Sequence, residues 1–116
     1  MSGIKEIDVK RETLATLREL RVKMTSPEFR SLVRSSELPA RQKAAQQMFA
    51  VADAYQVLLK AQIDSIRQQL KNNAPELKTT TADLKQAVNQ LNDLTKTLNA
   101  ISKFLGAVGK IIKLIL

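Results

Sequence analysis

The amino-acid sequence predicts an all-α fold, built as a single helical domain over residues 1–116. Apolar residues recur at heptad spacing toward the C-terminus, the pattern with which an α-helix buries one stripe against other helices. The chain of 116 residues has only three Gly, three Pro, three Phe and one Tyr, whereas an all-β fold needs more turn residues and aromatics. The few turn signals divide the chain into four helical segments.

The first two segments are short helices. Residues 6–24 are predicted to form a helix because the apolar residues from Ile7 to Met24 fall largely on one face. Thr25, Ser26 and Pro27 then mark a turn, and proline is well tolerated in the first turn of the helix that follows. Residues 27–34 are therefore predicted to form a second helix of about two turns.

The third segment is predicted to be long. Its first turn contains Pro39, and no helix breaker follows until the run Asn72-Asn73-Ala74-Pro75. Residues 38–71 are therefore predicted to form one helix of about 50 Å, at 1.5 Å per residue. Residues 72–75 combine two Asn with a Pro, which is typical of a turn, and are predicted to connect this helix to the next.

The fourth segment is predicted to begin at residue 76 or 80 and to continue to residue 116. Its apolar seam resembles that of a coiled coil and contains Leu77, Leu84, Leu91, Leu98, Leu105 and Ile112. Since a short turn makes consecutive helices antiparallel neighbours, we expect a long antiparallel hairpin of residues 38–72 and 76–116. The two N-terminal helices would pack on it and form a three- or four-helix base.

The sequence argues against an enzyme. It contains no Cys and no His, which removes the thiolate nucleophile, the most common general base and the usual metal ligands. It also has no Gly-rich phosphate loop and no Ser/His arrangement. We therefore expect no catalytic, cofactor-binding or metal site and no small-molecule substrate. A non-enzymatic structural or interaction protein is the predicted class.

Residues 98–116 are the predicted interaction element, because their last turns are apolar nearly all round and need a cover. We expect the protein to form a homo-oligomer, or to bind a helical partner protein, through this face. Its residues are Leu98, Ile101, Phe104, Leu105, Val108, Ile111, Ile112, Ile115 and Leu116. Lys103, Lys110 and Lys113 fall on the opposite side, where they would face solvent or lipid headgroups.

Two other partners remain open alternatives. A cationic amphipathic helix such as residues 98–116 is typical of proteins that lie on an anionic membrane, and this is the first alternative. The second is DNA, since the net charge is +8 and the N-terminal helices are basic. Arg side chains can contact phosphates and base edges, and the candidates are Arg30, Arg34, Arg41 and Lys43.

The N-terminal residues indicate little about the cellular location. The stretch MSGIKEIDVKRETL contains acidic residues and no apolar core, so no secretory signal peptide is expected. A cytoplasmic protein, a peripheral membrane protein and export by a signal-independent route all remain open.

Overall fold

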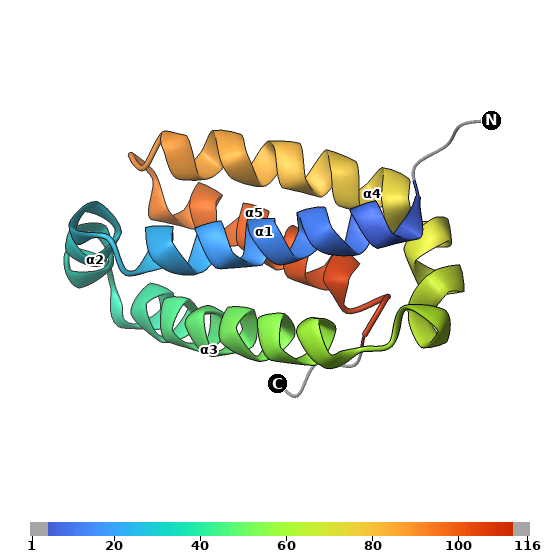
Figure 1. Cartoon of the computed structure of the whole chain (residues 1–116). Helices are drawn as coiled ribbons and strands as arrows, with labels where there is room; N and C mark the ends of the chain where they lie inside the picture. The colour runs from blue at the N-terminus through green and yellow to red at the C-terminus, as the bar shows by residue number, and fades with distance from the viewer. Residues whose placement is uncertain (1–4, 113–116) are drawn as a thin grey trace.

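The computed structural model describes residues 5–112 and contains five α-helices and no strand within that range (Figure 1). The all-α prediction is confirmed. In chain order the helices are α1 (Glu6–Met24), α2 (Pro27–Arg34), α3 (Leu38–Lys60), α4 (Ile63–Asn89) and α5 (Leu94–Val108).

Helices α1 and α2 have the bounds that the sequence predicts. The side chain of Ser26 caps α2 by accepting a hydrogen bond from the backbone N–H of Phe29 at 3.2 Å. Pro27 follows in the first turn, where its missing N–H costs no helical hydrogen bond. Phe29 is 1% exposed and anchors this short helix to the core. Local signals were sufficient to define both helices.

The predicted continuous helix over residues 38–71 is wrong. Helix α3 ends at Lys60, and the extended residues Ala61 and Gln62, with ψ of 133° and 132°, redirect the chain into α4. The sequence has no breaker at this point, and a contact from α1 supports the bend. The Nζ atom of Lys10 donates a hydrogen bond to the carbonyl oxygen of Ala61 at 2.7 Å.

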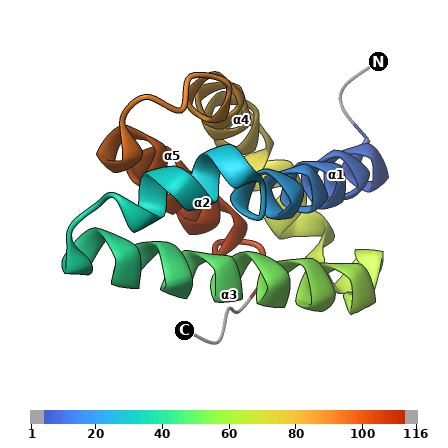
Figure 2. The same ribbon diagram turned by 90° about the vertical axis from the view of Figure 1, so that its left-hand side faces the viewer.

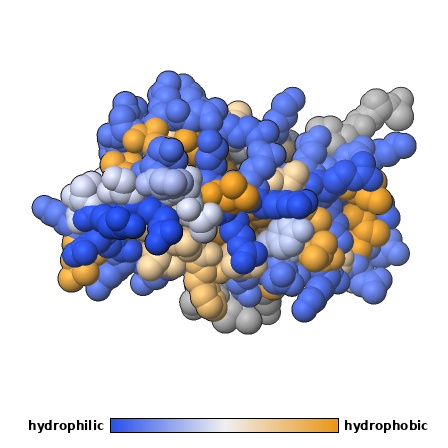
Figure 3. Space-filling model, turned by 60° about the vertical axis from the view of Figure 1, so that its left-hand side comes forward, coloured by the Kyte–Doolittle hydropathy of each residue, from blue (hydrophilic) through white to orange (hydrophobic). Residues whose placement is uncertain are grey.

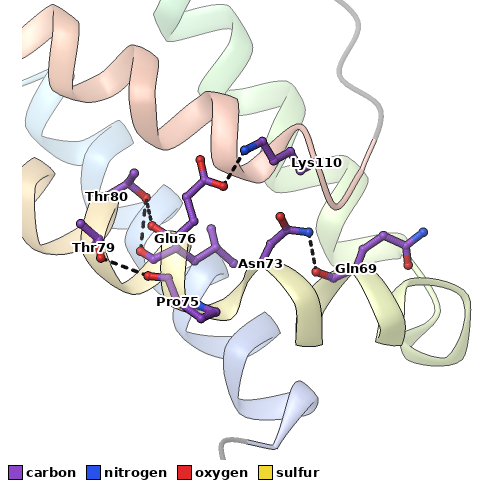
Figure 4. A network of polar contacts seen from close by, with 8 residues as sticks. Gln69, Asn73, Pro75, Glu76, Thr79, Thr80 and Lys110 are labelled. Atoms are coloured by element: carbon purple, nitrogen blue, oxygen red, sulfur yellow. Dashed lines mark hydrogen bonds and ion pairs between the residues drawn. The ribbon is translucent and has the colours of Figure 1, made fainter.

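The predicted turn at residues 72–75 is also wrong, because α4 continues through it with Pro75 in its interior. The buried stripe of α4 lies on both sides of this proline: Leu70 and Leu77 are 0% and 3% exposed. Burial of that stripe therefore outweighs the cost of Pro75, which lacks the N–H that would bond the carbonyl of Lys71. Side chains of Asn73 and Thr79 bond carbonyl groups of the same helix, as Figure 4 shows.

The predicted helix from residue 76 or 80 to 116 is wrong as well. The chain turns at residues 90–93, and Asp93 caps α5 by accepting a hydrogen bond from the N–H of Lys96 at 3.3 Å. Helix α5 ends at Val108, and residues 113–116 lie outside the described range. The heptad seam hid this turn because Leu84 of α4 and Leu98 of α5 both face the same core.

An antiparallel helical hairpin is present as expected, but α4 and α5 form it in place of residues 38–72 and 76–116, and the N-terminal helices pack on α3 and α4 (Figure 1). Helix α1 packs against α3 and α4, and α5 packs against the same two helices, so that four helices enclose one core. Helix α2 lies at one end of this bundle (Figure 2). The molecule measures 48 × 27 × 18 Å. Leu17, Leu58, Leu70, Ile101 and Phe104 fill its centre and have no exposed surface.

Candidate interaction surface on α3

Most of the predicted interface on the C-terminal helix is part of the core. Helices α3 and α4 cover α5, and none of its predicted interface residues is more than 7% exposed. These residues are Leu98, Ile101, Phe104, Leu105 and Val108 of α5, followed by Ile111 and Ile112. Ile115 and Leu116 lie outside the described residues. Within residues 98–112, the cover that this face needs therefore comes from the same chain.

The lysines predicted to flank this face are exposed where they are described. Lys103 faces solvent, and Lys110 forms an ion pair with Glu76 of α4 at 2.6 Å (Figure 4). Lys113 lies outside the described residues. Within residues 5–112, no helix combines the length and apolar character needed to cross a membrane. A membrane-surface role for α5 would need its apolar face, and that face packs inside the protein.

The structure brings together three of the four basic residues that were candidates for DNA binding. Arg30, Arg34 and Arg41 line a groove of about 340 Å³ between α2 and α3. Lys43 lines a different groove, between α3 and α5, where its Nζ lies 3.5 Å from Oδ1 of Asn99. The four residues therefore do not form a single basic surface.

An exposed apolar stripe on α3 was not among the predicted interaction sites. Phe49 is 68% exposed, Leu38 55%, Leu59 48% and Met48 38%. At 100° per residue these side chains share one side of the helix with Ala45, which is exposed, and Ala52, which is partly exposed. The exposed polar residues Arg41 and Gln56 lie on the same side. We call the six apolar residues the α3 face. The opposite side of α3, which includes Val51, Ala54 and Leu58, is buried in the bundle.

The α3 face lies at the edge of the molecule. In Figures 1 and 2 no other described helix lies on the outer side of α3. Figure 3 shows hydrophobic residues at the surface in separate patches between hydrophilic ones. A helix that is apolar on both sides is usually buried on both sides. Helix α3 therefore carries an apolar surface that no other helix within residues 5–112 covers.

Two grooves border the α3 face. Met48 and Ala45 contribute to the groove between α2 and α3. On the other side Phe49 borders a groove of about 810 Å³ between α3 and α5, together with Ala50, Leu105 and Gly106. The face is therefore a ridge between two hollows. A ridge of this shape offers side chains that a second helix can pack against.

Gln47 joins α3 to α5 beneath this surface. It is 6% exposed, and its Nε2 donates hydrogen bonds to the carbonyl oxygen of Leu98 at 3.0 Å and to Oγ of Ser102 at 2.7 Å. Its Oε1 is buried and has no hydrogen-bond partner among the described residues. The two donated bonds fix how α3 sits on α5, and they therefore hold the α3 face in place.

Some charged groups of the bundle form ion pairs within or between helices. The guanidinium of Arg67 bonds Asp64 at 3.0 Å and Glu6 at 3.1 Å, which raises the pKa of Arg67 and ties α4 to α1. Among the described residues no group of three or more acidic side chains is placed to hold a metal ion. Comparisons with protein-family models, with curated proteins and with solved structures found no match. The geometry of the α3 face is therefore the main guide to function.

Proposed function

We propose that this protein is a non-enzymatic helical interaction protein that self-associates through the α3 face. One observation carries the proposal: Phe49, 68% exposed, stands at the centre of an apolar stripe of six residues that none of the other described helices covers. Contiguous apolar surface exposed to water is unfavourable and is typical of an interaction site. The proposal moves the self-association surface from the buried C-terminal face to α3.

The charge distribution along α3 supports an interface. Residues 44–59 contain one charged residue, Asp53, whereas Arg41, Lys43 and Lys60 lie outside that stretch. Interface centres are depleted in charged residues and enriched in Phe and Met, with polar residues at the rim. The central part of α3 has the composition of an interface centre, and its charged ends have the composition of a rim.

Other exposed apolar residues do not form such a surface. Val22 is 66% exposed on α1, but its sequence neighbours are Arg21 and Lys23. Single exposed apolar residues are normal on protein surfaces and need no partner. Val22 therefore provides a control that matches Phe49 in exposure but not in surroundings.

The proposal can be tested by measuring solution mass for Phe49→Asp and Val22→Asp. Sedimentation would cover about 1 to 500 µM, which spans weak protein affinities. We expect the wild-type protein and Val22→Asp to rise above the monomer mass of 12.9 kDa as concentration increases, and Phe49→Asp to remain there. A wild-type protein that is monomeric throughout, or equal loss of mass in both variants, would contradict the proposal.

DNA binding is a second candidate, favoured by Arg30, Arg34 and Arg41 around one groove. Contacts with phosphates release counterions, so such binding weakens steeply with added salt. We expect Arg30→Gln with Arg41→Gln to weaken binding to a duplex at low salt, and Lys43→Gln to leave it nearly unchanged. No binding of the wild-type protein at low salt would eliminate this candidate.

A further inference from the structure

The residues of the α3 face are arranged symmetrically along the helix. Leu38 and Leu59 lie at its two ends, Ala45 and Ala52 lie inside them, and Met48 and Phe49 occupy the centre. Each of these pairs is centred on the point midway between Met48 and Phe49. Reversing the direction of α3 about this point therefore places leucine on leucine and alanine on alanine.

This symmetry suits a twofold interface, in which residue i of one copy contacts residue j of the other and j contacts i, because the twofold rotation then places the apolar residues of one copy on those of the other. We infer that a second copy of this chain docks antiparallel on the α3 face, with the twofold axis between Met48 and Phe49. The inference rests on the proposed self-association and specifies its geometry. Leu38 is then level with the partner's Leu59, and Ala45 with the partner's Ala52.

The side-chain sizes fit this arrangement. Leu38, Ala45, Ala52 and Leu59 are spaced seven residues apart, so they form a stripe nearly parallel to the helix axis. The small Ala side chains on this stripe allow two helices to approach closely. Phe49 projects on one side of the stripe and Met48 on the other. Around the twofold axis, the two Phe49 rings meet on one side and the two Met48 side chains on the other.

Charges at the two ends of α3 favour the antiparallel direction. Glu37 precedes the face and Lys60 follows it, and this pair is centred on the same point as the apolar pairs. In an antiparallel dimer each Glu37 is at the same height along the helix as the partner's Lys60, on the opposite side of the seam, so the two charges attract each other without forming a close ion pair. In a parallel dimer Glu37, Arg41 and Lys60 would each lie beside the same residue of the other copy. Such like-charge contacts select orientation more than they set affinity.

Disulfide trapping can test the geometry because the chain contains no Cys. Position 45 is level with the partner's position 52 in the proposed dimer. It is offset from the partner's position 45 by seven residues, about 10.5 Å along the helix. A disulfide spans Cα atoms roughly 4.4–6.8 Å apart, so it can join 45 to 52 but not 45 to 45. Both positions carry Ala, so Ala45→Cys and Ala52→Cys change volume little.

In the experiment, full-length Ala45→Cys and Ala52→Cys chains carrying different mass labels are mixed, oxidised and analysed by mass spectrometry. We expect the mixed 45–52 dimer to exceed either homodimer by about tenfold, in line with the narrow distance range of a disulfide. Ala82→Cys, at an exposed position on α4, gives the level of collisional cross-linking. Predominance of 45–45 and 52–52 homodimers, or a statistical mixture, would overturn the antiparallel register.

Solution mass of the same reduced variants separates the two proposals. One helix face makes a small interface, so we expect dissociation at roughly micromolar concentration or above, and samples must reach hundreds of micromolar. If the reduced protein dimerises but oxidation does not favour the disulfide between positions 45 and 52, only the antiparallel register is contradicted. A reduced protein that stays monomeric at every concentration contradicts the proposed self-association itself.

Discussion

Phe49 and Phe104 are the same residue type in opposite environments. Phe104 has no exposed surface and lies between α5 and its neighbours in the core, whereas Phe49 is 68% exposed on α3. Full burial of an aromatic side chain stabilises a small bundle substantially, and exposure of one leaves most of that free energy available for association. Substitutions at Phe104 should therefore affect folding, and substitutions at Phe49 should affect the proposed association.

At the residue scale we predict different effects for the two truncations. Phe104→Ala leaves a cavity in the core and is expected to lower the free energy of unfolding by about 3–5 kcal/mol. Phe49→Ala is expected to change it by less than about 0.5 kcal/mol in dilute solution. Urea unfolding followed by circular dichroism measures both. A near-neutral Phe104→Ala that instead altered solution mass would restore the C-terminal face as the interface.

Pro75 lies inside α4, although proline is unfavourable in the interior of a helix. It removes one helical hydrogen bond and is nevertheless accommodated because Leu70 and Leu77 are both buried on the face toward α1 and α5. The bonds from Asn73 and Thr79 to carbonyl groups of α4 occur around it (Figure 4). The helix therefore retains a local destabilising residue.

At the element scale, replacing this proline is expected to stabilise the protein. Pro75→Ala restores a backbone donor and should raise the free energy of unfolding by about 1–3 kcal/mol. Pro39→Ala is the matched control, because Pro39 lies in the first turn of α3 and removes no helical bond. Urea midpoints compare the two. A destabilised Pro75→Ala would show that the packing of α4 depends on a distortion at Pro75.

The elements also show which features a sequence can predict. Pro27 and Ser26 define the start of α2 by local chemistry, and the bounds of α1 and α2 were predicted correctly. The bend at Ala61 has no breaker and is supported by Lys10 of α1, which only the tertiary structure brings near. Asp93 could have been recognised as a helix cap, but the uninterrupted heptads around it predicted a continuous helix.

The candidate surface was harder to predict for a related reason. Helix α3 has an apolar stripe on each side, one containing Val51 and Leu58 and the other containing Ala45 and Phe49. Hydrophobic spacing identifies both stripes but does not indicate which one the bundle buries. The observed turns at residues 61–62 and 90–93 let one stripe pack internally and leave the other exposed.

At the scale of the whole molecule, four helices around one core leave the α3 face at the edge, and the chain carries a net charge of +8. Mutual repulsion of like-charged copies opposes association and keeps it weak. Burial of apolar surface on α3 opposes that repulsion. Repulsion and apolar burial together set a weak affinity, so the assembled fraction changes over an accessible range of concentrations. The most informative measurements therefore follow the same sample over that range.

Tryptophan emission gives the sharpest test of association through the α3 face, because the chain contains no Trp. Phe49→Trp places the sole indole in the α3 face, and Val22→Trp places it at a similarly exposed position on α1. With rising concentration, we expect the emission of Phe49→Trp to shift to the blue as the ring leaves water, while Val22→Trp stays constant. Emission from position 49 that is independent of concentration while the mass increases would contradict association through the α3 face.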